Sequence, residues 1–247
     1  MQTKENEGFK YHKPYAEEDL TPNTETKKVV EWIGHDKTVL EFACFTGHLS
    51  SWLKKFGCKV TGVELNEDAL EKAKPYLVQS IAGDIERPET WAAIKENSFD
   101  VVAFMHILEH LKDAETALKR GTERLNDHGI IIIALPNVSN AWDRFEMLRG
   151  RFEYTDMGVM DRTHLRFFNQ KTARELIEGA GLEIVDYFSP WQVNPLKVFF
   201  YQIPLFWNRP KVCKHRKPPR FPRFSKNMTD VVMLLKCRKK RILERNT

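Results

Sequence analysis

Residues 38–57 carry the pattern of a strand, a tight turn and a helix, and no other stretch limits the fold as strongly. A short apolar run leads to Glu41 and Phe42, small residues follow, and Gly47 opens a helical pattern. This order is typical of a buried strand, a turn and a helix N-terminus. Residues 59–64 (KVTGVE) repeat the strand and put a carboxylate, Glu64, at its end.

Strands and helices are expected to alternate along the chain. The apolar runs predict strands at about 38–42, 58–63, 77–81, 99–105, 129–135, 182–188 and 230–237. Helical spacing predicts helices ending near 32 and at about 47–56, 66–73, 88–95, 113–125 and 170–180. This alternation indicates an α/β fold with a doubly wound sheet.

Glu64 suggests what such a sheet would bind. The carboxyl ends of parallel strands lie along one edge of the sheet, and ligands bind there. A carboxylate at the end of the second strand can accept hydrogen bonds from both hydroxyls of a ribose. The sequence therefore predicts a ligand that contains a nucleoside.

Residues 39–47 (VLEFACFTG) resemble the first motif of class I S-adenosylmethionine (SAM) dependent methyltransferases, V-L-D/E-x-G-C-G-T-G, and 83–86 resemble their third-strand motif. The resemblance covers about 25–190 and implies a Rossmann-like seven-stranded sheet whose last strand runs antiparallel between the fifth and sixth. Ala43 and Phe45 replace glycines of the motif, and the Phe45 ring stands where backbone usually approaches the cofactor. The residues expected to contact the cofactor are Glu41, Ala43, Phe45, Gly47, Glu64, Leu65, Asp84, Ile85 and Met105.

His106, Glu109 and His110 follow the fourth strand at spacings of three and four residues. One turn of helix would place them on one face. The group could supply a catalytic base or bind a metal, or it could be a polar turn that caps the strand. The pattern H-x-x-E-H also occurs in inverted zinc proteases, but those need a long active-site helix, which this position after a central strand does not offer.

The same stretch is similar to the E-x-x-E-H motif of ubiquinone-biosynthesis O-methyltransferases and small-RNA 2′-O-methyltransferases, with His106 in place of the first Glu. The resemblance implies a divalent ion, and His164 would join the set. Imidazoles with one carboxylate suit Zn²⁺, Fe²⁺ or Mn²⁺ better than Mg²⁺. The alternative is catalysis without metal, with His110, His164 or His106 as the base.

Residues 161–168 (DRTHLRFF) resemble a segment of bacterial methyltransferases that act in glycan and secondary metabolism. Arg162 and Arg166 could bind an anionic acceptor, or Arg166 could pair with an acid such as Glu109. The insertion 137–168 is expected on the acceptor side. Its aromatic residues could stack on a ring of the acceptor or form a core: Trp142, Phe145, Phe152 and Tyr154.

The net charge of +5 is unevenly distributed. Residues 187–247 contain 15 Lys/Arg and 2 Asp/Glu, so the rest of the chain is acidic. Within this region, 195–226 combine aromatic and basic residues, a composition that suits an anionic membrane surface or a lid over the substrate. It also suits single-stranded nucleic acid, but no RNA-binding motif accompanies it, and nucleic acid is the least favoured partner.

The N-terminus has no apolar signal-peptide core, and the four cysteines have no paired spacing. These features predict a cytoplasmic protein, with peripheral attachment at the inner membrane face as an option. The expected organisation is an N-terminal arm (1–24), a methyltransferase domain (25–188 and 228–240), and a basic aromatic lid or membrane-contact segment (189–227).

The leading functional hypothesis is SAM-dependent O-methylation of a small-molecule or glycan-type acceptor. The alternatives are a non-catalytic binding module, in which Phe45 blocks the cofactor cleft, and an RNA 2′-O-methyltransferase. A dinucleotide oxidoreductase is disfavoured because residues 43–47 do not provide G-x-G-x-x-G.

Overall fold

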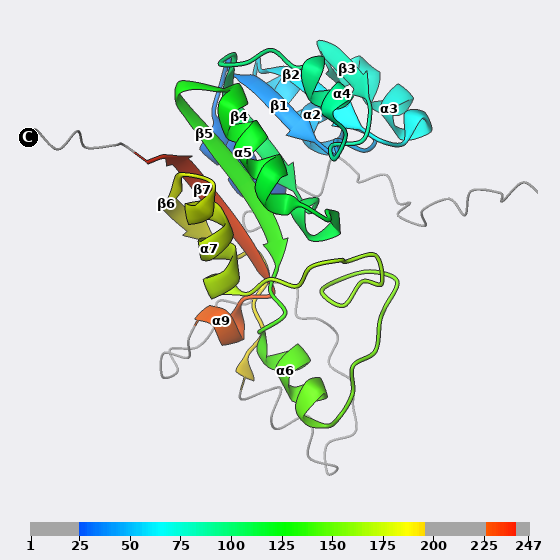
Figure 1. Ribbon diagram of the computed structural model, residues 1–247, viewed down its shortest axis with the longest axis vertical. Helices are drawn as coiled ribbons and strands as arrows, with labels where there is room; N and C mark the ends of the chain where they lie inside the picture. Colours follow the sequence, from blue (N-terminus) through cyan, green and yellow to red (C-terminus); the bar gives the residue numbers. More distant parts are fainter. Residues whose placement is uncertain (1–24, 196–225, 241–247) are drawn as a thin grey trace, which may run out of the picture.

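The computed structural model describes residues 25–195 and 226–240, and its centre is one seven-stranded sheet (Figure 1). The spatial order is β3-β2-β1-β4-β5-β7-β6. The strands are β1 (Thr38–Phe42), β2 (Lys59–Glu64), β3 (Gln79–Ala82), β4 (Phe99–Met105), β5 (Leu125–Pro136), β6 (Leu182–Phe188) and β7 (Val232–Lys239). Only β7 runs antiparallel, and it lies between β5 and β6. The predicted doubly wound, Rossmann-like sheet with an antiparallel last strand is confirmed.

Helices cover both faces of the sheet. Successive strand residues point to opposite sides, and the apolar residues on each side pack against helices. On one face, α1 (Glu25–Ile33) and α2 (His48–Lys55) pack on alternate strand residues such as Val101 and Ile132. On the other face, α4 (Pro88–Ala92), α5 (Ala114–Arg124) and α7 (Gln170–Gly179) pack on the residues between them, such as Val102 and Ile133. The central strands are therefore apolar on both sides, as parallel strands require.

Short polar signals set the helix boundaries. Asn66 begins α3 (Glu67–Ala73) by accepting a hydrogen bond from the Ala69 amide, and Asn169 forms a capping box with Thr172 at α7. Beyond α3, a 3₁₀ turn (η2, Lys74–Tyr76) contains Pro75 and delays β3 until Gln79, two residues later than expected.

The insertion after β5 contains a helix that the sequence did not predict, α6 (Ala141–Leu148). Both ends of the insertion are tied together, because Asn137 and Phe168 form a β-bridge and the Val138 amide donates to the Phe168 carbonyl. The insertion is therefore attached at the carboxyl end of β5 and lies in the lower part of Figure 1.

A few expectations fall beyond what can be described. The N-terminal arm (1–24), Cys213 and nearly all of the aromatic and basic segment 195–226 lie outside the described residues. The short helix α9 (Lys226–Thr229) precedes β7. Cys44, Cys58 and Cys237 are buried free thiols. Within 25–195 and 226–240, the structure has no helix that is both long and apolar enough to cross a bilayer.

Candidate active site

The turn between β1 and α2 has an unusual backbone. Ala43 (φ 54°), Phe45 (φ 47°) and Gly47 (φ 81°) all adopt left-handed conformations. At Gly47 only glycine fits, since a Cβ there would lie 3.0 Å from the Cα of Ala73. Ala43 and Phe45 adopt the same region at a cost of about 1–2 kcal/mol each. The turn thus keeps the conformation of a glycine-rich loop although two of its three glycines are replaced.

Glu64 anchors this turn. Its Oε2 accepts a hydrogen bond from the Phe45 amide at 3.0 Å, and its Oε1 accepts one from the Asn66 amide at 2.9 Å. A carboxylate has about four acceptor positions, so both oxygens retain capacity for a further donor. Glu64 therefore holds the turn and offers acceptors at the end of β2.

Glu41 is buried beneath the same turn, at the end of β1. Ser50, on α2, donates a hydrogen bond to its Oε2 at 2.5 Å. Burial raises the pKa of Glu41 to about 7; the Ser50 hydrogen bond lowers it and the charge of Glu64 raises it further. The proton of Glu41 is consequently exchangeable near neutral pH.

The loop after β3 completes this edge. Asp84 accepts a hydrogen bond from the Glu86 amide at 2.8 Å, and Ile85 is buried beside it. Glu86 in turn accepts from the amides of Lys112 and Asp113, which joins this loop to the one after β4. Leu65, 68% exposed, presents an apolar side chain next to Glu64. Met105, at the end of β4, is half-buried.

Three of the four predicted metal-site residues meet at the end of β4. Glu109 and His110 lie in a 3₁₀ turn, η3 (Leu108–His110), and His164 comes from the insertion. One ligand atom from each lies within 4.8 Å of the other two. The amides of Leu165 and Arg166 both donate to the Glu109 carbonyl, so the backbone itself docks the insertion on this turn.

Both imidazoles are oriented by backbone carbonyls. His110 Nδ1 lies 3.2 Å from the Thr163 carbonyl oxygen, and His164 Nδ1 lies 3.0 Å from that of Val159. A carbonyl only accepts, so each Nδ1 must carry the proton, and each Nε2 of a neutral ring keeps its lone pair. The pKa of His164 lies below its usual value, chiefly because of burial, which keeps this ring neutral at pH 7.

Glu109 carries an unsatisfied acceptor into this group. Its side chain is 1% exposed, and its Oε2 has no hydrogen-bond partner among the residues that the structure describes. A buried carboxylate oxygen without a partner is costly. Two imidazoles beside such an oxygen form a donor set that fits a divalent transition-metal ion.

His106 does not belong to this group. Its backbone turns left-handed (φ 51°), so the continuous helical face expected for residues 106–110 does not form. Its Nε2 lies 2.9 Å from Glu25 on α1, and its Nδ1 lies 3.5 Å from Glu109. Partial burial lowers its pKa, but the two carboxylates outweigh this and raise the pKa well above its usual value. Through the contact with Glu25, His106 joins α1 to the site.

The contacts of Arg162 and Arg166 within the protein differ, and the expectation that they bind an anionic acceptor stays a prediction. Arg166 donates to the backbone carbonyls of Leu111 and Lys112, so it fixes the turn and pairs with no Glu109 carboxylate. Arg162 forms an exposed ion pair with Asp156 at 2.7 Å. Both guanidinium groups already have partners within the protein.

Two supporting residues escaped the sequence analysis. Asp161 is 2% exposed, and its Oδ1 accepts hydrogen bonds from the amide and hydroxyl of Thr163. Thr163 also supplies the carbonyl that orients His110. The only signal was the position of Asp161 three residues before His164. Trp142, Phe152 and Tyr154 of the insertion prove exposed, so they form no buried core.

The fold and this edge define a class. A seven-stranded sheet with an antiparallel β7 is the fold of Rossmann-like methyltransferases among the solved structures. The sequence also matches the family described as methyltransferase domain, over residues 15–187. The chain belongs to this family and is a SAM-dependent methyltransferase.

Relatives and solved structures agree. The chain is 26% identical over 175 residues to a ubiquinone biosynthesis O-methyltransferase of Azoarcus sp. (strain BH72), covering 68% of this chain and 75% of the relative. A protein of the same description from Idiomarina loihiensis is 34% identical over 166 residues, covering 66% and 68%.

Among solved structures, a SAM-dependent methyltransferase from Archaeoglobus fulgidus superposes with a TM-score of 0.61 at 15% identity, covering 88% of this chain and 92% of that one. The 1,6-didemethyltoxoflavin-N1-methyltransferase of Burkholderia thailandensis, solved with 1,6-didemethyltoxoflavin and S-adenosylhomocysteine, has a TM-score of 0.52 at 14% identity, covering 87% and 76%. At these identities the likeness concerns the fold.

Proposed function

We propose that this protein transfers the methyl group of SAM to a hydroxyl oxygen of a small-molecule acceptor. The observation that carries the proposal is the group formed by Glu109, His110 and His164 at the carboxyl end of β4, beside the cofactor edge. The relatives named as O-methyltransferases support the choice of oxygen as the acceptor atom.

The cofactor edge would bind SAM through groups that already converge there. Glu64 would accept the ribose hydroxyls, Asp84 and Leu65 would face the adenine, and the turn at Gly47 would lie near the methionine end. Glu41, whose pKa burial raises to about 7, would be held ionised by a positively charged group bound nearby. SAM supplies a methyl group activated by a positive sulfur, so alignment provides most of the catalysis.

The acceptor hydroxyl must lose its proton during transfer. Glu109, His110 and His164 would hold a divalent ion, and the unpartnered Oε2 of Glu109 is the observation that fits one. An ion bound there would act as a Lewis acid and lower the pKa of a coordinated hydroxyl. Without an ion, the neutral His164 ring could accept the proton itself through Nε2, a contribution of about 10²–10⁴-fold in rate.

Calorimetric titration with S-adenosylhomocysteine tests the cofactor assignment. Glu64→Ala removes a charge-assisted contact and should weaken binding by about 1.5–3 kcal/mol. Glu67→Ala removes an exposed carboxylate at the start of α3 and should bind as the wild type does. Equal affinity of the Glu64 variant and the wild type would contradict the assignment. A wild-type protein that binds neither SAM nor its demethylated product would favour the non-catalytic binding module.

A further inference from the structure

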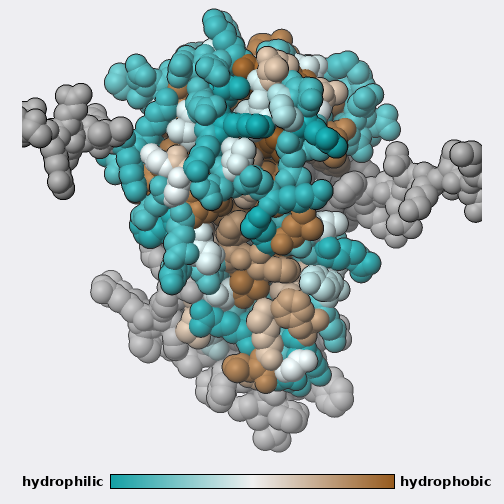
Figure 2. Space-filling view, viewed as in Figure 1, coloured by the Kyte–Doolittle hydropathy of each residue, from teal (hydrophilic) through white to brown (hydrophobic). Residues whose placement is uncertain are grey.

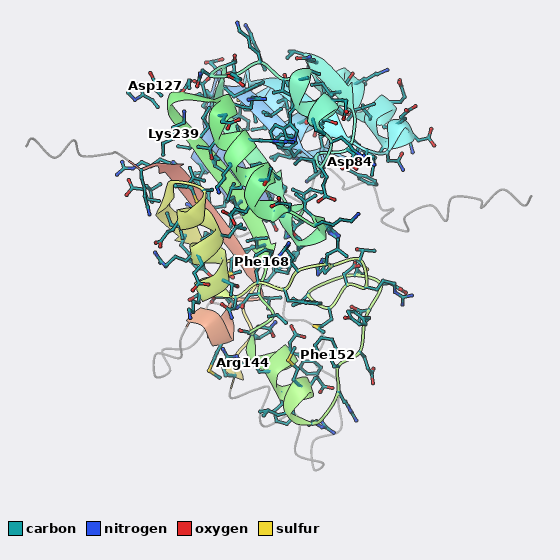
Figure 3. The ribbon with its side chains drawn as sticks, viewed as in Figure 1. Asp84, Asp127, Arg144, Phe152, Phe168 and Lys239 are labelled. Carbon is teal, nitrogen blue, oxygen red and sulfur yellow. The ribbon has the colours of Figure 1, made fainter. Side chains whose placement is uncertain are left out.

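The insertion contains a cavity that is separate from the edge of the sheet where Glu41, Glu64 and Asp84 lie. It has a volume of about 290 Å³ and lies between α6 and the loop 151–160. Residues 142, 143, 146 and 147 form one wall, because their spacing puts them on one side of α6. Figure 3 shows Phe152, which lines the opposite wall, next to α6 and well separated from Asp84.

The apolar part of the lining is open to solvent. Trp142 is 40% exposed, Phe152 52% and Met157 69%. Figure 2 shows apolar side chains gathered in this lower part of the surface, with hydrophilic residues around them. Large apolar side chains that stay exposed around a hollow are characteristic of a binding site, since packing alone would bury them.

The polar part of the lining is acidic. Asp143, Glu146 and Glu153 contribute three carboxyl groups, whereas Arg151 is the one cation among the lining residues and lies 3.4 Å from Glu146. Burial raises the pKa of Asp143 to about 6; the Asn140 hydrogen bond lowers it, and the charge of Glu146 raises it. The lining thus holds three carboxyl groups against one guanidinium, a charge balance that would favour a bound cation.

The cavity is connected to the histidine pair by aromatic rings. Phe152 packs edge-on against Phe167 at 6.2 Å between centroids, and Phe167 packs edge-on against His164 at 6.2 Å. Met160, another lining residue, follows Val159, whose carbonyl orients the His164 ring. Two rings, those of Phe152 and Phe167, thus connect the cavity to a proposed catalytic residue.

We propose that this cavity binds a small molecule with an apolar body and a positively charged amine. The amine would lie among Asp143, Glu146 and Glu153, and the body would pack on Trp142 and Phe152, whose ring faces also attract cations. If the proposed function holds, this molecule would be the methyl acceptor, and that role rests on the proposed function. The binding of the molecule to the cavity does not depend on the proposed function. An anionic acceptor, suggested by the arginines of 161–168, is disfavoured by the charge of the lining.

A matched set of probes tests the charge requirement. Calorimetry or ligand-observed NMR would compare 2-phenylethylammonium, 2-phenylethanol and 3-phenylpropionate on the full chain at pH 7.5. We expect the ammonium compound to bind at least about tenfold more tightly than the alcohol, and the carboxylate not to bind. Equal binding of amine and alcohol, or no binding of the amine, would overturn the proposal.

Variants locate the site. Asp143→Asn and Glu153→Gln should each weaken amine binding several-fold and leave alcohol binding unchanged. Glu153 is exposed and forms no hydrogen bond or ion pair with the residues that the structure describes, so its variant remains informative if Asp143→Asn disturbs the helix. Glu175→Gln removes the same charge from the exposed side of α7 and serves as the control. Wild-type affinity in both cavity variants would overturn the assignment.

The two proposals can fail separately. Titration of S-adenosylhomocysteine into the same variants should give wild-type affinity. Amine binding without S-adenosylhomocysteine binding would count against the methyltransferase site alone, and the reverse would count against the cavity alone.

Discussion

The cofactor edge and the insertion differ in what holds their functional side chains. Glu41 and Glu64 stand in or at the end of strands, and hydrogen bonds to α2 and to backbone amides fix their carboxylates. Trp142 and Phe152 belong to a short helix and a loop, and large parts of both rings face solvent. In Figure 3, Asp84 and Phe152 mark these two regions, with Phe168 between them.

Under the proposed function, this difference would separate binding of the cofactor from binding of the acceptor. The cofactor is constant across the family, so a site built on rigid strand ends suits it. Acceptors vary, and variable contacts are most easily carried by loops placed on a rigid scaffold. Between the two lies the Glu109–His110–His164 group. The turn η3 after β4 contributes Glu109 and His110, and the insertion contributes His164.

The largest expected effect concerns this shared group. His164→Ala should lower the affinity for Zn²⁺ or Co²⁺ more than about 100-fold, since loss of an outer-shell partner alone costs about 10–100-fold. Affinity for S-adenosylhomocysteine should not change. The measurement is competition with a chromophoric chelator, supported by elemental analysis of protein purified without chelator.

Two further variants serve for comparison with His164→Ala, one with a smaller expected effect and one as a control. Thr163→Val removes the hydroxyl beside His110 Nδ1 and should lower metal affinity less than His164→Ala does. His128→Ala removes an exposed imidazole from β5 and should have no effect. Absence of metal binding by the wild type would leave His164 or His110 as a metal-free base.

The second prediction concerns Glu41 and the pH dependence of stability. Its pKa of about 7 in the folded protein exceeds the ordinary value of 4.5, so folding favours its neutral form. This contribution is present below pH 4.5 and is lost as the pH rises through 7. Between pH 5 and 8 the wild type should lose about 2–3 kcal/mol relative to Glu41→Gln.

Urea unfolding of both proteins at several pH values measures this difference. Glu41 accepts a hydrogen bond from Ser50, and its charge interacts with two titratable groups, Cys44 and Glu64. Both titratable groups remain in the Glu41→Gln variant. A difference in unfolding free energy that stays constant from pH 5 to 8 would mean that Glu41 is ionised throughout.

The third prediction compares one substitution in the two regions. Asn66 caps α3 and Asn140 caps α6, each through hydrogen bonds from backbone amides to the side-chain oxygen. Replacing either by Ala should cost about 1 kcal/mol. α3 packs Leu70 and Ala73 into a core cluster, whereas α6 buries only Ala141. Asn66→Ala should therefore lower global stability, and Asn140→Ala should mainly loosen α6.

Hydrogen exchange resolved by residue, together with urea unfolding, distinguishes these outcomes. Faster exchange confined to 141–148 in the Asn140 variant is expected. A global loss of equal size in both variants would show that the insertion folds as one unit with the sheet.

The contrast between the strand ends and the insertion also explains which features could be predicted from the sequence. The strands and the positions of Glu41, Glu64 and Asp84 follow from apolar periodicity and a motif, because strand ends must meet at one edge. The place of the antiparallel last strand followed from the family resemblance. The approach of His164 to Glu109 also followed from the motif. The left-handed φ of His106, which directs its ring to Glu25, has no local signal.

The insertion was predicted least well. α6 is short and buries only Ala141, so its residues show little of the periodicity that marks a core helix. Arg166 donates to backbone carbonyls, partners that depend on how 161–168 docks and not on neighbouring residues. The cavity of the insertion lies between α6 and the loop 151–160. The contact between these two segments could not be predicted from residue spacing in the sequence.

The smallest effect expected is in the turn after β1. Ala43→Gly removes the left-handed penalty of about 1–2 kcal/mol but adds the backbone entropy of glycine, about 0.5–1 kcal/mol. The net gain in stability should lie between zero and about 1.5 kcal/mol. Phe45→Gly relieves the same strain and removes a ring beside the cofactor edge, so it should tighten binding of S-adenosylhomocysteine.

Asn97→Gly provides the control, because Asn97 also has a left-handed φ (48°) but lies in the loop before β4. Its variant should change stability slightly and leave S-adenosylhomocysteine binding unchanged. If Phe45→Gly binds S-adenosylhomocysteine no better than the wild type, the ring does not restrict the cofactor. It would then be part of the binding surface, and the cofactor edge, like the insertion, would carry a contact particular to this chain.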